Sequence, residues 1–113
     1  MNLKKLPAVF YATASGNEPV REWLKGLTAE DRRTIGQDIS DVEYGWPIGM
    51  PLCKNLGQGI YEVRSTLRNG RIARVMFCVT DRHMVLLHGF IKKTQKTPQP
   101  DLALAIKRKK EVT

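Results

Sequence analysis

The sequence predicts a single α+β domain in which an antiparallel β-sheet carries helices on one face. Apolar residues recur at helical spacing between residues 19 and 44, and the stretches between residues 60 and 91 are typical of β-strands. The length of 113 residues suits one domain spanning the whole chain and leaves little room for a second. The expected order is a strand, a helical hairpin, three strands and a C-terminal helix.

The first half of the chain is expected to form a short strand and then the helical hairpin. Residues 6–12 predict the strand, with Pro7 confined to its start. The first helix begins near Pro19, because proline is tolerated in a first turn. Thr28 opens the second helix, with Asp31 three residues later in the manner of a capping box. We interpret the apolar stripes of both helices as core packing and assign them no other role. These stripes are Val20, Trp23, Leu24 and Leu27 in the first helix and Ile35, Ile39 and Val42 in the second.

The second half is expected to form the sheet and the last helix. Residues 45–59 are rich in Gly and Pro and predict a surface loop. Residues 60–67, 71–79 and 84–91 predict three strands, and residues 101–111 predict a helix. The helix has apolar residues on one side and ends in four basic residues, which suit the negative end of the helix dipole.

The hairpin around Asn69-Gly70 decides which charged residues share a sheet face. A two-residue turn would place Ser65 opposite Arg74 and put that arginine on the apolar face. A three-residue loop ending in a left-handed Gly70 moves the register by one residue, so that Arg64 lies opposite Arg74. Because burial of an unpaired arginine is costly, we predict the second register. It gathers the apolar side chains on one face, namely Tyr61, Val63, Leu67, Ala73, Val75, Phe77 and Val79.

The opposite face then displays Glu62, Arg64 and Arg74. With the helices expected on the apolar face, we expect these three side chains to be exposed. Two arginines side by side repel each other unless an anionic group lies over them, which points to a binding surface. The alternative is that Glu62 bridges the two as a surface ion-pair network that contributes little to stability. The spacing does not decide between these interpretations.

The last strand and the loop after it add further candidate residues. His88 alternates onto the same face as Lys92, although a lone histidine in such a strand is more often a hydrogen-bonded core residue than a catalyst. Gly89 indicates a bulge or a close approach of the backbone to another element. Residues 92–98 place three lysines in one loop, which is either a solvated loop or a phosphate-binding site beside the arginines.

Composition favours a polyanionic partner. Nineteen Lys and Arg residues against eleven Asp and Glu give a formal net charge of +8, which predicts attraction to nucleic acid, the ribosome or an acidic protein. Cys53 and Cys78 have neither metal-site nor redox spacing, so we expect two buried free thiols and a cytoplasmic protein. Neither a signal peptide nor a membrane helix is expected.

Three segments together resemble a known family. They are residues 60–64 (IYEVR), residues 74–77 (RVMF) and residues 86–98 (LLHGFIKKTQKTP). The chain resembles HigB-like toxins, in the phage-derived branch of the RelE/ParE superfamily, over nearly its whole length. The resemblance implies a RelE-like fold and the toxin of a type II toxin–antitoxin module, inhibited by a cognate antitoxin that commonly carries a helix-turn-helix. It also implies a metal-free, cofactor-free endoribonuclease that cleaves messenger RNA on the ribosome, leaves a 2′,3′-cyclic phosphate and inhibits translation.

The resemblance also assigns site residues. Arg64, Arg74 and either Lys92 or Lys93 match basic positions of the family, and Glu62 stands where RelE itself has a basic residue. The C-terminal Tyr or His of some relatives has no counterpart here. The two arginines suit the charge of the phosphorane, Glu62 is the candidate base, and Lys92 or His88 is the candidate acid. Further RNA contacts are expected from basic residues of the hairpin and the lysine loop, namely Arg68, Arg71, Lys93 and Lys96.

Two other functions remain open for the same fold. ParE-type relatives poison gyrase, and the basic patch would then bind protein or DNA. A phage-derived nucleic-acid-binding regulator without toxicity is the third possibility.

Overall fold

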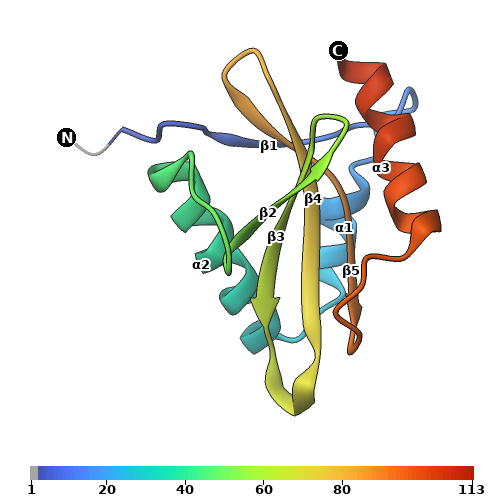
Figure 1. Ribbon diagram of the computed structural model, residues 1–113. Helices are drawn as coiled ribbons and strands as arrows, with labels where there is room; N and C mark the ends of the chain where they lie inside the picture. The colour runs from blue at the N-terminus through green and yellow to red at the C-terminus, as the bar shows by residue number, and fades with distance from the viewer. Residues whose placement is uncertain (1–2) are drawn as a thin grey trace.

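Five strands form one mixed sheet in the computed structural model, which describes residues 3–113 (Figure 1). The spatial order is β1-β5-β4-β3-β2, and β1 runs parallel to β5 while the other neighbours are antiparallel. The expectation of a purely antiparallel sheet was therefore wrong at β1. Strands β1 and β5 are separated in sequence by both N-terminal helices and three strands, and a connection of that length permits parallel pairing. The strands are β1 (Ala8–Phe10), β2 (Cys53–Gly57), β3 (Ile60–Thr66), β4 (Ile72–Thr80) and β5 (His83–Lys92).

Three helices lie where the sequence predicted them: α1 (Pro19–Lys25), α2 (Ala29–Gly45) and α3 (Gln99–Val112). Pro19 opens α1, and the Thr28 hydroxyl accepts a hydrogen bond from the Asp31 backbone N–H at 3.2 Å at the start of α2. Although α1 and α2 are joined by a tight turn, α1 packs mainly on β5 and α2 on β3. Each helix is thus fixed by its own part of the sheet.

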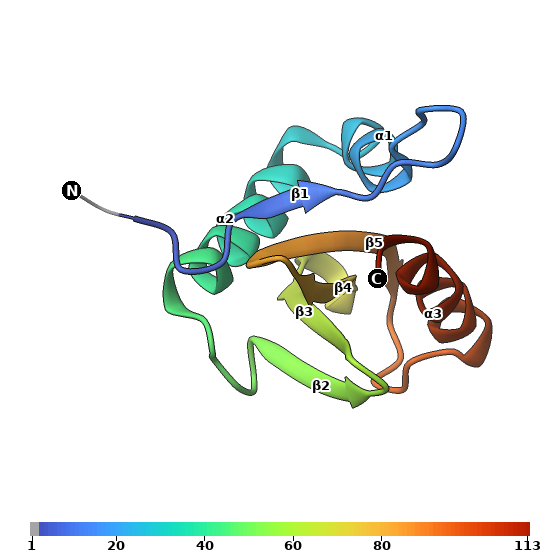
Figure 2. The same ribbon diagram turned by 90° about the horizontal axis from the view of Figure 1, so that it is seen from above.

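The helices cover both faces of the sheet, with α3 on the side opposite α1 and α2 (Figure 2). One core lies beneath α1 and α2 and includes both predicted stripes. The second core lies between α3 and the other face, where Ile60, Met76, Leu87 and Ala105 are fully buried. The expectation that helices cover only one face was wrong. The physical reason is that β3, β4 and β5 carry apolar residues on this face too, and the apolar side of α3 buries them.

The predicted loop of residues 45–59 contains a strand that the sequence did not reveal. In β2, Cys53 pairs with Val63 and Asn55 pairs with Tyr61. The segment reads CKNLG, which has little of the β-branched and aromatic content of strands. Pairing with β3, rather than its own propensity, therefore holds it in the sheet.

The register of the β3–β4 hairpin was predicted correctly. Arg64 lies opposite Arg74, and the Leu67 N–H donates to the Arg71 carbonyl at 2.9 Å. Gly70 has a φ of +71°, as the three-residue loop requires, and Asn69 is also left-handed with a φ of +64°. The hairpin thus fixes the two arginines as cross-strand neighbours.

Gly89 is a point of close approach between β5 and α1. A Cβ atom at this position would lie 2.5 Å from Cζ3 of Trp23, so the indole ring occupies the space of the missing side chain. The β4–β5 register also shifts by one residue next to Met76. Of the two alternatives predicted for Gly89, the close approach is the one present there, because Gly89 itself pairs with Val75 and the shift falls between Leu86 and His88.

Both cysteines are free and buried, as expected. Burial raises the pKa of the Cys53 thiol to about 11 and also raises that of Cys78. Within residues 3–113, no helix has the length and apolar character needed to cross a bilayer.

Candidate functional site

The arginine pair lies beneath a covering segment. Arg64 on β3 and Arg74 on β4 point to the same face as α3, and their side chains are 12% and 0% exposed. Glu62, two residues before Arg64, is also fully buried. The expectation of an open charged face was therefore wrong. The chain returns over this face after β5, and residues 94–97, which we call the strap, contact all three side chains.

Glu62 is shared by the two guanidinium groups. Its Oε1 accepts a hydrogen bond from Nε of Arg64 at 2.8 Å and lies 3.9 Å from Nε of Arg74. Its Oε2 accepts a hydrogen bond from the Thr97 hydroxyl at 3.0 Å. The bridging role considered from the sequence is thus present, but in a buried network rather than on the surface. Two cations facing one anion leave this cluster with an excess positive charge.

The strap contributes two backbone carbonyls to the same cluster. Nη2 of Arg64 donates to the Gln95 carbonyl at 2.7 Å, and Nη2 of Arg74 donates to the Thr94 carbonyl. Within residues 3–113, Nε and Nη1 of Arg74 are buried without a hydrogen-bond partner. Burial lowers the pKa of Arg74, and the nearby charge of Glu62 opposes this effect. Donors left unpaired in a buried position favour an additional acceptor.

Phe90, on β5, places its ring against two of the cationic groups. The guanidinium carbon of Arg74 lies 5.6 Å from the centre of the Phe90 ring, and Nζ of Lys92 lies 6.0 Å from it. Lys92 and Lys96 also line an open pocket of about 470 Å³ together with Thr94 and Thr97. The structure therefore brings the lysine loop next to the arginine pair. Lys93 is exposed in the same loop.

His88 is engaged with the first turn of α3. Its Nε2 lies 2.6 Å from Oδ1 of Asp101, and Nζ of Lys92 lies 3.9 Å from the other oxygen of that carboxylate. The His88 side chain is 17% exposed, and its ring stacks on Phe90 at 5.6 Å. This is the hydrogen-bonded histidine that the sequence offered as the alternative to a catalyst. It links β5 to α3 at the edge of the arginine cluster.

The two hairpin arginines have other partners. Arg71 forms a bidentate pair with Asp31 at 2.8 and 3.2 Å, and these hydrogen bonds lower the pKa of Asp31 and raise that of Arg71. Arg68 pairs with Glu30 at 2.7 Å, and its side chain is 77% exposed. Both therefore pair with the first turn of α2, on the side of the sheet away from the strap.

Sequence reasoning missed several residues of the site. Thr97, Asp101 and Phe90 contact the predicted residues through hydrogen bonds, an ion pair and ring faces. No local pattern marks the contacts of Thr97 and Asp101, because their partners lie 35 and 13 positions away in the chain. Phe90 contacts Arg74 from 16 positions away, but it also alternates onto the face of His88 and Lys92, so strand periodicity offered a signal for it. The other signal was the position of Asp101 in the first turn of a helix, where acidic residues are common for dipole reasons alone.

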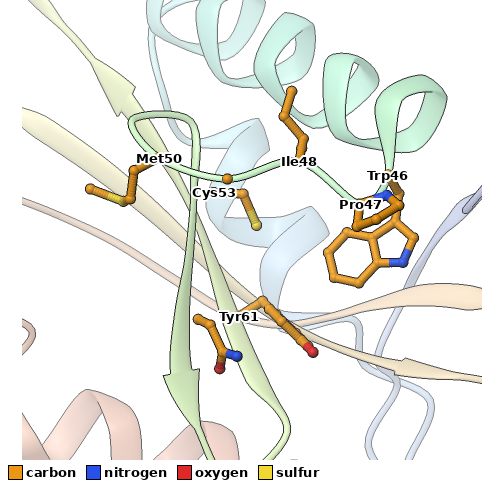
Figure 3. A pocket seen from close by; sticks show the side chains of 8 residues that line it. Trp46, Pro47, Ile48, Met50, Cys53 and Tyr61 are labelled. Atoms are coloured by element: carbon orange, nitrogen blue, oxygen red, sulfur yellow. The ribbon is translucent and has the colours of Figure 1, made fainter.

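A second pocket lies beside the edge strand β2, on the side of α2 (Figure 3). It has a volume of about 450 Å³, and Trp46 and Tyr61 line it with rings 4.9 Å apart in an edge-to-face arrangement. Ile48 and Met50 border it from the loop after α2 (Figure 3). None of the residues predicted for the site lines this pocket. Nowhere in residues 3–113 do three His, Cys, Asp or Glu side chains form a group that could hold a metal ion.

Comparison with known proteins identifies the family. The family model described as phage-derived protein Gp49-like (DUF891) matches residues 22–110, which include α2, all the strands from β2 to β5, the strap and most of α3. Comparison with curated proteins gives no match. A match over this much of the chain shows membership, and toxins of this kind are paired with an antitoxin. The chain therefore belongs to the phage-derived Gp49-like family, which is a RelE/ParE-like toxin family of toxin–antitoxin systems.

Proposed function

We propose that this protein is a HigB-like toxin that cleaves messenger RNA on the ribosome, with Arg64 and Arg74 binding the phosphate at the cleaved bond. The observation that carries the proposal is the excess positive charge of the Arg64–Glu62–Arg74 cluster, together with the unpaired donors of Arg74. A phosphate group supplies both the negative charge and several acceptor oxygens. The formal net charge of +8 also supports an RNA partner, because the RNA backbone is a polyanion.

The proposed reaction is a transesterification within the RNA. The 2′-oxygen attacks the adjacent phosphorus, the bond from phosphorus to the 5′-oxygen breaks, and the leaving oxygen takes up a proton. The products are a 2′,3′-cyclic phosphate and a 5′-hydroxyl. The guanidinium groups of Arg64 and Arg74 stabilise the charge that builds up on the non-bridging oxygens. An interaction of this kind contributes roughly 10²- to 10³-fold to the rate.

We assign the proposed acid and base roles from the exposure and contacts of the side chains. Of the two proposed acids we favour Lys92, whose side chain is 47% exposed, lines the strap pocket and lies 3.9 Å from Asp101. His88 is 17% exposed and lies 2.6 Å from the same carboxylate. Glu62 is enclosed between the arginines, so we assign it first to holding Arg64 and Arg74 in place. Its role as the base for the 2′-hydroxyl requires that RNA reach its carboxylate. Lys93 and Lys96 are proposed to contact neighbouring phosphates.

Primer extension on cellular mRNA after induction tests the nuclease. We expect discrete new 5′ ends within reading frames for the wild type and their loss in Arg64→Gln. The control is Arg21→Gln on α1, where the side chain is 51% exposed and, within residues 3–113, pairs only with the nearby Glu18 at 3.5 Å. Circular dichroism of both purified variants shows whether they fold. DNA damage with intact mRNA would contradict the proposal and indicate a gyrase poison instead.

The ribosome and the antitoxin are tested separately. The purified toxin is expected to cleave an mRNA under translation much faster than the same mRNA alone. The proposed antitoxin is a helix-turn-helix protein, and its co-expression is expected to abolish the new 5′ ends. Equal cleavage of free and translated mRNA would contradict the proposed dependence on the ribosome.

A further inference from the structure

We infer that the strap is a closed cover over the arginine pair, and that an incoming phosphate group must displace it. This inference rests on the proposed function for the identity of the phosphate as RNA. The first observation is the position of the two strap carbonyls. Those of Thr94 and Gln95 accept hydrogen bonds from the terminal nitrogens of Arg74 and Arg64, respectively. These are the donors that a phosphate would use, so the carbonyl oxygens and the phosphate oxygens compete for them.

The second observation is that the closed arrangement satisfies the arginines incompletely. Neutral carbonyls give the cluster no negative charge, so two guanidinium groups still share the single carboxylate of Glu62. Nε and Nη1 of Arg74 remain buried without a hydrogen-bond partner in residues 3–113. A phosphate would provide charge and acceptors that the strap lacks, and this difference in interaction favours the open state when phosphate is present.

The third observation is that the strap is attached to the sheet by few bonds. Apart from its two carbonyls, the only hydrogen bond from the strap to the sheet within residues 3–113 is that of the Thr97 hydroxyl with Glu62. Among the residues that the structure describes, the Thr94 hydroxyl bonds only within the strap, to the Lys96 carbonyl at 3.4 Å. The side chains of residues 94–96 face solvent and belong to neither apolar core. The strap can therefore leave the arginines while β5 and α3 keep their packing.

The hydrogen bond from the Thr97 hydroxyl to Glu62 stabilises the closed strap without involving either arginine. Thr97→Val keeps the shape of the side chain and removes the donor, which leaves a buried carboxylate oxygen unpaired in the closed state only. We expect the population of the open state to rise about tenfold, as for a lost hydrogen bond to a charged group. Thr94→Val is the matched control, because it makes the same change in the same strap without touching Glu62.

Trypsin cleavage after Lys93 and Lys96 measures strap opening in the intact protein. Cleavage after Arg82, in the exposed β4–β5 turn, serves as an internal standard for protease activity. Thr97→Val is expected to raise strap cleavage about tenfold relative to Arg82, since slow proteolysis follows the open population. Inorganic phosphate, at an ionic strength matched with chloride, is expected to raise strap cleavage in the wild type. Unchanged cleavage in Thr97→Val, or protection of the strap by phosphate, would overturn the inference.

Binding of a 2′-O-methyl RNA oligonucleotide, which cannot undergo the reaction, provides the second readout. If the closed strap opposes binding, Thr97→Val lowers the apparent Kd for the oligonucleotide by up to about tenfold. The reason is that a larger fraction of the protein is in the open state that binds RNA. Weaker binding in Thr97→Val would overturn the inference and make the strap part of the RNA-binding surface. If induction gives no new 5′ ends in cellular mRNA while phosphate still promotes strap cleavage, the proposed nuclease function fails. That result would still support the strap as a cover over an anion site.

Discussion

Removal of the charge of Glu62 should be among the most destabilising polar substitutions in this protein. The carboxylate lies 2.8 Å from Nε of Arg64 and 3.9 Å from Nε of Arg74, and it is fully buried. In Glu62→Gln the two guanidinium groups would face each other with no anion between them. Removal of one partner from a buried ion pair costs about 3–5 kcal/mol. For a chain of this size that corresponds to a fall in Tm of roughly 12–20 °C.

Thermal unfolding monitored by circular dichroism measures this loss. The matched control is Glu22→Gln on α1, where the carboxylate is 64% exposed and lies 4.0 Å from Lys25. An exposed pair of this kind contributes less than about 1 kcal/mol. Phosphate should also stabilise Glu62→Gln more than the wild type, since it replaces the missing anion. A cost for Glu62→Gln no larger than that of the control would refute the buried, shared carboxylate.

Three further predictions concern other parts of the molecule. Gly89→Ala should destabilise the fold by about 1–3 kcal/mol in urea unfolding, because the new Cβ would overlap the Trp23 ring. Asp31→Asn should cost most at neutral pH and progressively less as the pH falls through the pKa of Asp31, which Arg71 holds below the usual value of 3.8. The depressed pKa means that this stabilisation is complete above pH 3.8 and is lost in acid, which urea unfolding at several pH values tests. The Cys53 thiol, with its pKa raised to about 11, should react with a thiol reagent at pH 8 only after unfolding.

Each of these has its own control. Gly36 lies in the interior of α2 with open space around its missing Cβ, so Gly36→Ala should stabilise the fold by about 0.5–1 kcal/mol. Asp38→Asn, at a residue for which no ion pair is found in the described chain, should cost less at neutral pH than Asp31→Asn, which loses the pair with Arg71. Rapid thiol reaction in the native protein would contradict the burial of Cys53.

The cross-strand pairing of Arg64 with Arg74 was predictable, because it depends on the local conformation of the hairpin. The turn at residues 68–70 and the cost of burying an arginine on the apolar face together select one register. The burial of the same arginines was not predictable in this way. It depends on the strap and α3 returning over the sheet, and the contacts involved join residues 20 to 35 positions apart. Periodicity carries no information about such contacts.

The sheet shows the same division between local and long-range information. Strands β3, β4 and β5 have strong apolar content and were recognised, whereas β2 is stabilised by its neighbour and was not. The parallel pairing of β1 with β5 also joins segments that are far apart in the sequence, so no local pattern predicts it. The prediction of α3 was correct, but nothing in its sequence indicates which face of the sheet it covers.

The placement of α3 has a consequence for protein synthesis. Residues 94–112 follow all five strands in the chain, so they emerge from the ribosome after the sheet-forming segments. Until they do, Ile60, Met76 and Leu87 have no helix to cover them, and Arg74 has no strap above it. A nascent chain at this stage presents an apolar surface with a cationic centre, which is a suitable target for a chaperone. The same stage leaves Arg64 and Arg74 without the strap that later covers them.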